Sequence, residues 1–86
     1  DQPIAAICAA PALALAANGL LDGRRATCYP SFRELLPTFV DAPVVRDGPI
    51  TTSQGPGTAI AFALELIEQL ADRARRDLVA AGLLLP

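Results

Sequence analysis

The chain contains no lysine and no histidine, and these two absences exclude several kinds of functional site. All seven basic residues are arginines, so a Walker-type phosphate loop, a lysine Schiff base and a Ser–Lys nucleophile pair are excluded. Histidine is the commonest general base and metal ligand, and two cysteines alone make neither a zinc site nor a disulfide scaffold. We therefore expect no bound metal. The net charge of −2 leaves no basic surplus for phosphates, so no nucleic-acid partner is expected.

Long hydrophobic runs and methionine are also missing. The longest uncharged apolar stretch, Pro3 to Ala17, is too short for a membrane-spanning helix and contains Pro3 and Pro11. Asp1 has the wrong sign for the start of a secretory signal. These features predict a soluble protein without a membrane partner, in the cytoplasm or in an organellar stroma or matrix. Without an initiator methionine, we expect processing or truncation upstream of Asp1.

Apolar residues are abundant for so short a chain. They make up 52% of the 86 residues, although a chain of this length buries a thin core. The composition predicts that the chain lies on a larger partner or belongs to a bigger domain.

The first half of the chain reads as alternating strands and short helices. Residues 4–7 form a short apolar run, which predicts a strand buried on both faces. A helix beginning at Pro11 is expected to end around Asn18-Gly19. Residues 24–29 predict a second strand, and Ser31 with Glu34 predicts a capping box on a helix reaching Leu36.

The second half predicts a hairpin and two helices. β-branched residues on both sides of Asp47-Gly48 are a strong hairpin signal. A long helix is expected from Thr58, and Asp72 is expected to cap a last helix through Ala81. The long helix carries a wide apolar face, which predicts deep burial against a sheet. That face is formed by Ile60, Leu64, Ile67 and Leu70.

Cys8 is the first candidate functional residue. Small residues two positions before and two positions after it match a nucleophile elbow, a strained turn between a strand and a helix. A thiol at the start of a helix is favoured as the thiolate, and the N–H of Ala9 could bind an oxyanion. The alternative is that Cys8 is a small buried apolar residue. The pattern alone leaves both interpretations open.

Residues 53–58, the sequence SQGPGT, are the second candidate. A glycine-rich loop that leads into a helix can bind an anion, but it can also be a simple strand-to-helix turn. With no lysine in the chain and no arginine nearby, the turn is favoured. Cys28 is interpreted as a buried structural thiol, with a disulfide to Cys8 left open. Three arginines are interpreted as a solvated helix face: Arg73, Arg75 and Arg76.

These motifs together resemble a known family. The sequence AAICAAP at 5–11, the Asp47-Gly48 hairpin and the sequence TTSQGPGT at 51–58 are similar to the ThiJ/PfpI superfamily in its DJ-one branch. The resemblance covers nearly the whole chain but only the C-terminal half of the family domain. It implies an α/β fold, a flavodoxin-like three-layer sandwich of which residues 1–86 are about the C-terminal half. It also implies a homodimer without a cofactor, with the N-terminal half of the same domain as a partner.

The resemblance also assigns roles to residues. It implies that Cys8 is the nucleophile and redox-sensing thiol, that Ala9 is a backbone donor, and that Tyr29, Ser53 and Gly55 are candidate site-lining residues. Tyr29 stands where many relatives carry histidine, and a phenol is a poor base at neutral pH. Ala9, not histidine, follows the cysteine, which argues against a Cys–His peptidase.

Two functions follow from this resemblance. The first is cofactor-free, cysteine-dependent detoxification of reactive carbonyls such as methylglyoxal, by a lyase of the glyoxalase III type or by a protein deglycase. Its acid partner for Cys8 would come from the N-terminal half. The second is a non-enzymatic redox sensor or chaperone-like module that signals by oxidation of Cys8.

Overall fold

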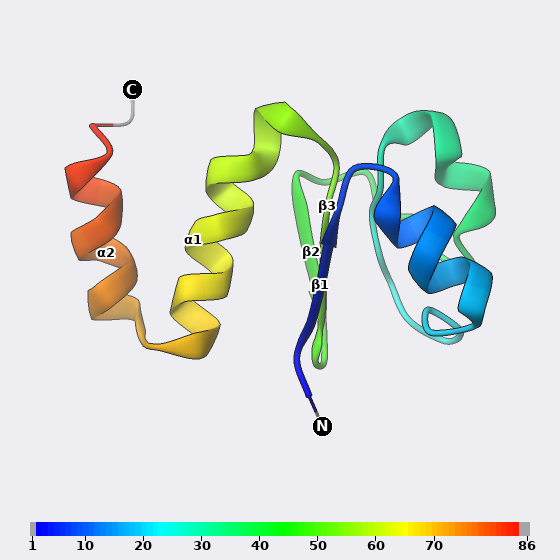
Figure 1. The fold of residues 1–86 in the computed structure, drawn as a ribbon, viewed down its shortest axis with the longest axis horizontal. Coiled ribbons are helices and arrows are strands. Elements are labelled where there is room, and N and C mark those ends of the chain that lie inside the picture. Colours follow the sequence, from blue (N-terminus) through cyan, green and yellow to red (C-terminus); the bar gives the residue numbers. More distant parts are fainter. Residues whose placement is uncertain (1, 85–86) are drawn as a thin grey trace.

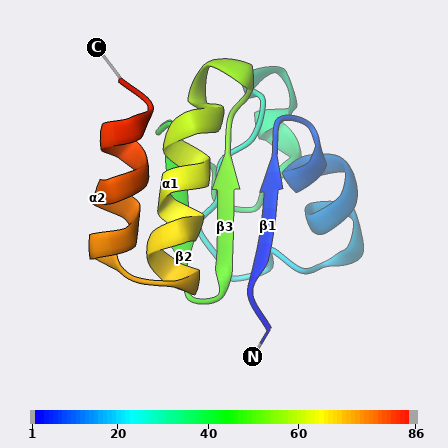
Figure 2. The ribbon, with the colours of Figure 1, turned by 60° about the vertical axis from the view of Figure 1, so that its left-hand side comes forward.

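A computed structural model describes residues 2–84, which are built around a three-stranded sheet. The strands are β1 (Ile4–Ile7), β2 (Val44–Asp47) and β3 (Ile50–Ser53), in the order β1-β3-β2. β3 lies in the middle, parallel to β1 and antiparallel to β2 (Figure 2). The register pairs Ile7 with Ser53, so the ends of β1 and β3 meet at one edge of the sheet.

The expected hairpin joins β2 to β3. Asp47 pairs with Ile50, so the two central turn residues are Gly48 and Pro49. Gly48 has a φ of 61°, and a positive φ at the first central position is the pattern of a type II′ turn. The hairpin is confirmed, with its turn one residue further along than the Asp-Gly pair suggested.

Helices cover both faces of the sheet, which gives the three layers seen in Figure 1. On one side are the short helical segments η1 (Pro11–Leu15), η2 (Ala16–Asn18) and η3 (Pro30–Leu35). Gly19, with a φ of 74°, ends the segment that began at Pro11, as predicted.

The opposite side holds the two longer helices. After the short turn η4 (Pro56–Thr58), α1 (Ala59–Leu70) packs on β2 and β3, and α2 (Arg73–Gly82) packs on α1 away from the sheet (Figure 1). Both helices were expected. The Asp72 cap is confirmed, because its Oδ1 accepts a hydrogen bond of 2.6 Å from the Arg75 N–H. No helix within residues 2–84 has the length and apolar character needed to cross a bilayer.

Two of the three arginines of α2, Arg73 and Arg76, lie at its junction with α1. Glu68 of α1 accepts a hydrogen bond of 2.9 Å from Arg76 Nη1, and Arg73 Nε lies 3.6 Å from the same carboxylate oxygen. Arg73 and Arg75 are exposed, which agrees with a solvated helix face.

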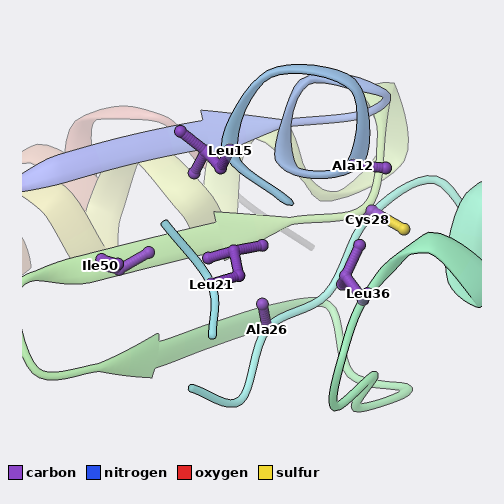
Figure 3. Packing of buried hydrophobic residues seen from close by; sticks show 7 residues of the cluster. All are labelled: Ala12, Leu15, Leu21, Ala26, Cys28, Leu36 and Ile50. Carbon is purple, nitrogen blue, oxygen red and sulfur yellow. The ribbon is translucent and has the colours of Figure 1, made fainter. Parts of the chain in front are cut away.

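The core lies between the sheet and the η segments (Figure 3). Its side chains come from η1, from the chain that follows η2, from residues 24–29, from the end of η3 and from β3. Its buried members are Ala12, Leu15, Leu21, Ala26, Cys28, Leu36 and Ile50.

Residues 24–29 are extended but do not form the predicted strand. The only ladder contact there is an isolated bridge between Ala26 and Phe39. Two of the amides bond to side chains instead: Arg25 N–H donates to Asp47 Oδ2 at 2.8 Å, and Thr27 N–H donates to Thr52 Oγ1 at 2.9 Å. The sequence predicted the extended backbone correctly, but its hydrogen-bond partners are not a neighbouring strand.

Two burial predictions were wrong. β1 is only partly buried, with Ala5 exposed, because in this structure β1 is an edge strand with one neighbour. The apolar face of α1 is not deeply buried either. Leu64 is 7% exposed, but Ile60 and Leu70 are 48% and 71% exposed, since the short sheet covers only part of the helix.

The predicted capping box at Ser31 is absent. η3 begins at Pro30, with Tyr29 in the cap position and no side-chain hydrogen bond to the cap. Proline suits the first helical position because its φ is fixed and it has no N–H to satisfy. It therefore starts the helix one residue early, and Ser31 falls inside the first turn.

Candidate functional site

Cys8 stands at the end of β1 in a left-handed backbone conformation that is unfavourable for cysteine. Its φ is 67°, which costs an L-residue roughly 1–2 kcal/mol. Two hydrogen bonds hold it there: the Cys8 N–H donates to Ser53 O at 3.1 Å, and the Tyr29 N–H donates to Cys8 O at 2.7 Å. A strained turn directly after a strand is the geometry that the small neighbouring residues predicted.

The helical segment after Cys8 begins within two residues. Ala9 O accepts the N–H groups of Ala12 and Leu13 at 3.1 and 2.9 Å, and Pro11 occupies the first turn. No hydrogen bond from the Ala9 N–H to another group is found among residues 2–84. This amide is therefore free to act as a donor next to the thiol.

The predicted site residues are brought together through their backbones. Ser53 and Tyr29 flank Cys8 through the two hydrogen bonds described above. Gly55 is buried close to the Tyr29 ring, since a Cβ at Gly55 would lie 3.7 Å from Tyr29 Cδ1. The Tyr29 side chain is 45% exposed and packs at a tilt of 54° against Phe32, with 6.4 Å between ring centroids.

The side chain of Ser53, in contrast, is fully buried and does not face solvent. Its Oγ donates to Pro43 O at 2.6 Å and lies 2.6 Å from Thr58 Oγ1. Thr58 Oγ1 in turn accepts the Gly55 N–H at 3.1 Å. Ser53 and Gly55 therefore belong to the turn that adjoins Cys8. The Ser53 hydroxyl and the Gly55 N–H are both occupied by hydrogen bonds within this turn, so neither is available to a ligand.

Cys28 lies in the core, between β3 and the η segments (Figure 3). It is fully buried, and its Sγ donates to Tyr29 O at 3.3 Å. Burial raises the pKa of the Cys28 thiol above its ordinary value, because the thiolate would lose its hydration. Both cysteines are free thiols, so the disulfide left open by the sequence does not form, and Cys28 is a structural thiol.

Thr58 contributes a hydroxyl whose role the sequence did not predict. It was placed at the end of the 53–58 loop and at the beginning of a helix, although a hydroxyl three residues after Gly55 is a signal for a turn closed by a side chain. Pro43 had no signal, because it contributes only a carbonyl from a distant loop. Within residues 2–84, no group of three His, Cys, Asp or Glu side chains is placed to hold a metal ion.

Comparisons with known proteins show the family of the chain. The model of the DJ-1/PfpI family matches residues 1–69. Protein DJ-1 homolog A of Arabidopsis thaliana is 53% identical over 85 residues, which are 94% of this chain and 22% of that protein. A glutathione-independent glyoxalase DJ-1 of Schizosaccharomyces pombe is 39% identical over 70 residues, which are 77% of this chain and 37% of that protein.

The structural comparison gives the same answer. The solved structure of oxidized Toxoplasma gondii DJ-1 superposes with a TM-score of 0.91 at 44% identity, covering 95% of this chain and 46% of that one. The fold is therefore that of the DJ-1 and ThiJ proteins, as expected, and the chain belongs to the DJ-1/PfpI family. It spans less than half the length of these relatives.

Proposed function

We propose that Cys8 is the nucleophile of a cofactor-free enzyme that converts small reactive aldehydes such as methylglyoxal to hydroxy acids. The observation that carries this proposal is the strained, half-buried Cys8 at the end of β1, beside the free Ala9 N–H. Backbone strain of this kind persists where the surroundings enforce it, and it is concentrated at active sites. The glyoxalase name of the Schizosaccharomyces pombe relative supports the choice of substrate.

The proposed reaction needs no external electron carrier. The Cys8 thiolate adds to the aldehyde carbon of methylglyoxal, and the Ala9 N–H stabilises the resulting oxyanion. A proton then moves from the former aldehyde carbon to the neighbouring ketone carbon, which oxidises the first carbon and reduces the second. Water releases the acyl group from sulfur as lactate, so the net change is the addition of one water molecule.

The proton transfers need a general acid and base, and no hydrogen bond to Cys8 Sγ is found among residues 2–84. We propose that residues 1–86 are the C-terminal half of a single domain, and that the N-terminal half supplies a carboxylate facing Cys8. The coverage of less than half of each relative supports this division. We further propose that the complete domain forms a homodimer. The two free thiols fit a reducing compartment such as the cytoplasm or an organellar stroma or matrix.

The intact mass of the natural polypeptide under denaturing conditions tests the half-domain proposal. A mass about twice that of the 86-residue chain, or a second polypeptide, is expected. A mass equal to that of this chain alone would refute the proposed division and, with it, the enzymatic function.

The enzymatic proposal is tested with the complete domain and the variant Cys8→Ser. Lactate formation from methylglyoxal is expected to fall by at least about a thousandfold, the usual consequence of removing a nucleophile. Cys28→Ala is the control, because it removes the other thiol from the core and leaves the elbow intact. Turnover that survives in Cys8→Ser would refute the role of Cys8.

A second candidate is a redox sensor or chaperone-like module that signals through Cys8 without turnover. The oxidized form of the Toxoplasma gondii relative and the partial exposure of Cys8 favour it. Low peroxide is then expected to add two oxygen atoms to Cys8 in stoichiometric amounts, as a sulfinate. A peptide mass that stays unchanged under these conditions would contradict the sensor.

A deglycase activity would instead appear as release of a sugar adduct from a glycated peptide. The unsubstituted protein is expected to release the adduct, and Cys8→Ser is not.

A further inference from the structure

The turn after β3 contains a chain of hydrogen bonds that links two hydroxyl groups. Ser53 has one hydroxyl proton, and it lies in the contact of 2.6 Å with Pro43 O, because a carbonyl cannot donate. Thr58 Oγ1 lies 2.6 Å from Ser53 Oγ and 2.9 Å from Gly55 O, and its single hydroxyl proton serves these two oxygens. The Thr58 oxygen also accepts the Gly55 N–H at 3.1 Å. The chain runs from Gly55 N–H through Thr58 and Ser53 to Pro43 O.

This chain is largely withdrawn from water. Ser53 is fully buried, Gly55 is buried and Thr58 is half-buried. Water cannot readily replace a hydrogen bond lost here, so removing one hydroxyl leaves its buried partners unsatisfied.

The chain passes through Ser53, the residue whose carbonyl holds the elbow. Ser53 anchors its side chain in the turn, and its carbonyl accepts the Cys8 N–H at 3.1 Å. Of the two hydrogen bonds that keep Cys8 at a φ of 67°, one therefore depends on where the turn fixes Ser53. A strained residue keeps its conformation only while its neighbours are themselves fixed.

We propose that Thr58 is a positioning residue for Cys8: through Ser53, its hydroxyl holds the carbonyl that keeps the elbow in its strained form. Among residues 2–84, the hydrogen bonds of the Thr58 hydroxyl go to Ser53 and Gly55 and not to Cys8. The kinetic part of this proposal rests on the proposed aldehyde chemistry, whereas the structural part does not.

The test uses the complete domain and the variant Thr58→Val, which replaces the hydroxyl with a methyl group of similar size. Amide hydrogen exchange at Cys8 is expected to become about three- to tenfold faster, the factor that corresponds to the loss of one hydrogen bond. The amides of α2 are expected to keep their rates, which separates a local change from general destabilisation. Thr58→Ser, which keeps the hydroxyl, is expected to restore slow exchange at Cys8.

Steady-state kinetics with methylglyoxal provide the second readout. For Thr58→Val, kcat is expected to fall by a similar factor while KM stays within about twofold, because the geometry of Cys8 changes and substrate binding does not. Thr38→Val is the matched control, since Thr38 is exposed and its hydroxyl takes no part in the chain.

Unchanged exchange at Cys8 in Thr58→Val would overturn the proposal, and so would failure of Thr58→Ser to restore it. If Thr58→Val does not fold, Ser53→Ala interrupts the same chain at its second hydroxyl and must accelerate the same amide. Absence of turnover in the unsubstituted protein would refute the aldehyde chemistry alone, and the exchange rates would still decide the role of Thr58.

Discussion

The two cysteines of this chain occupy opposite environments. Cys8 is half-buried at the end of an edge strand, whereas Cys28 is enclosed in the core and donates its only proton to Tyr29 O. Burial disfavours the thiolate of Cys28, so its pKa is raised. Only one of the two thiols is therefore placed to react while the protein is folded.

The raised pKa of Cys28 predicts how stability depends on pH. The folded state holds the Cys28 proton more tightly than the unfolded state. Below the ordinary thiol pKa of 9.0 the thiol is protonated in both states, so it does not make the free energy of unfolding depend on pH. As the pH rises above that value, the unfolded chain loses the proton first, and the free energy of unfolding is expected to fall. Urea unfolding between pH 7 and pH 10 measures the effect.

Cys28→Ala is the variant that isolates this contribution. Its stability is expected to be lower at pH 7, because a core side chain has been shortened, but to decline less steeply above pH 9. The same alkaline slope in both proteins would contradict the assignment of the raised pKa to Cys28.

Among the elements, the hairpin between β2 and β3 is held at its turn by hydrogen bonds from Arg24 and Arg25. Arg24 Nη1 donates to Asp47 O at 3.1 Å, and the Arg25 N–H donates to the Asp47 carboxylate. Gly48 lies under the Arg24 guanidinium, which a Cβ would displace. The turn therefore needs glycine for its positive φ, and a larger residue would also push the end of the Arg24 side chain away from Asp47.

Gly48→Ala is expected to destabilise the protein by about 1–2 kcal/mol, from the strained φ and the displacement of Arg24. Gly57→Ala is the matched control. A Cβ at Gly57 would have no neighbour within 4 Å and its φ is not positive, so the substitution is expected to be neutral or to stabilise by up to about 1 kcal/mol. Urea unfolding of both variants compares them, and equal effects would contradict this account of the turn.

The elements that the sequence predicted well are those with local causes. The Asp72 cap, the Gly19 helix end and the hairpin depend on residues within a few positions of each other. The strand at 24–29 was wrong because its amides bond to Asp47, Thr52 and Cys8, which are far away in sequence.

In the candidate site, too, the features with local causes could be predicted and those that depend on tertiary contacts could not. The conformation of Cys8 could be predicted from its small neighbours, since an elbow is a local turn. The role of Thr58 could not, because it depends on a contact with Ser53 that only the folded turn creates.

At the scale of the whole molecule, residues 2–84 leave apolar side chains of two helices and one edge of the sheet exposed to solvent. α1 and α2 expose Leu70 and Leu78 at 71% and 70%, and β1 presents an unpaired edge. Unpaired strand edges and large apolar patches promote association.

The 86-residue chain, produced alone, is therefore expected to bind a hydrophobic dye and to self-associate in light scattering. Adding the proposed N-terminal half is expected to suppress both signals. Leu78→Gln should lower dye binding by the isolated chain, whereas Arg75→Gln on the same helix should not. A monomeric isolated chain that does not bind the dye would contradict this expectation.

The positive φ of Cys8 also limits which amino acids a saturation library can place at that position. Glycine, asparagine and aspartate accept left-handed backbone readily, whereas valine, isoleucine and threonine are hindered by their branched Cβ. Threonine is therefore a poor replacement for Cys8, because its branched Cβ is hindered at this φ. Serine, which has an unbranched Cβ, fits this backbone better and can carry a hydroxyl in place of the thiol.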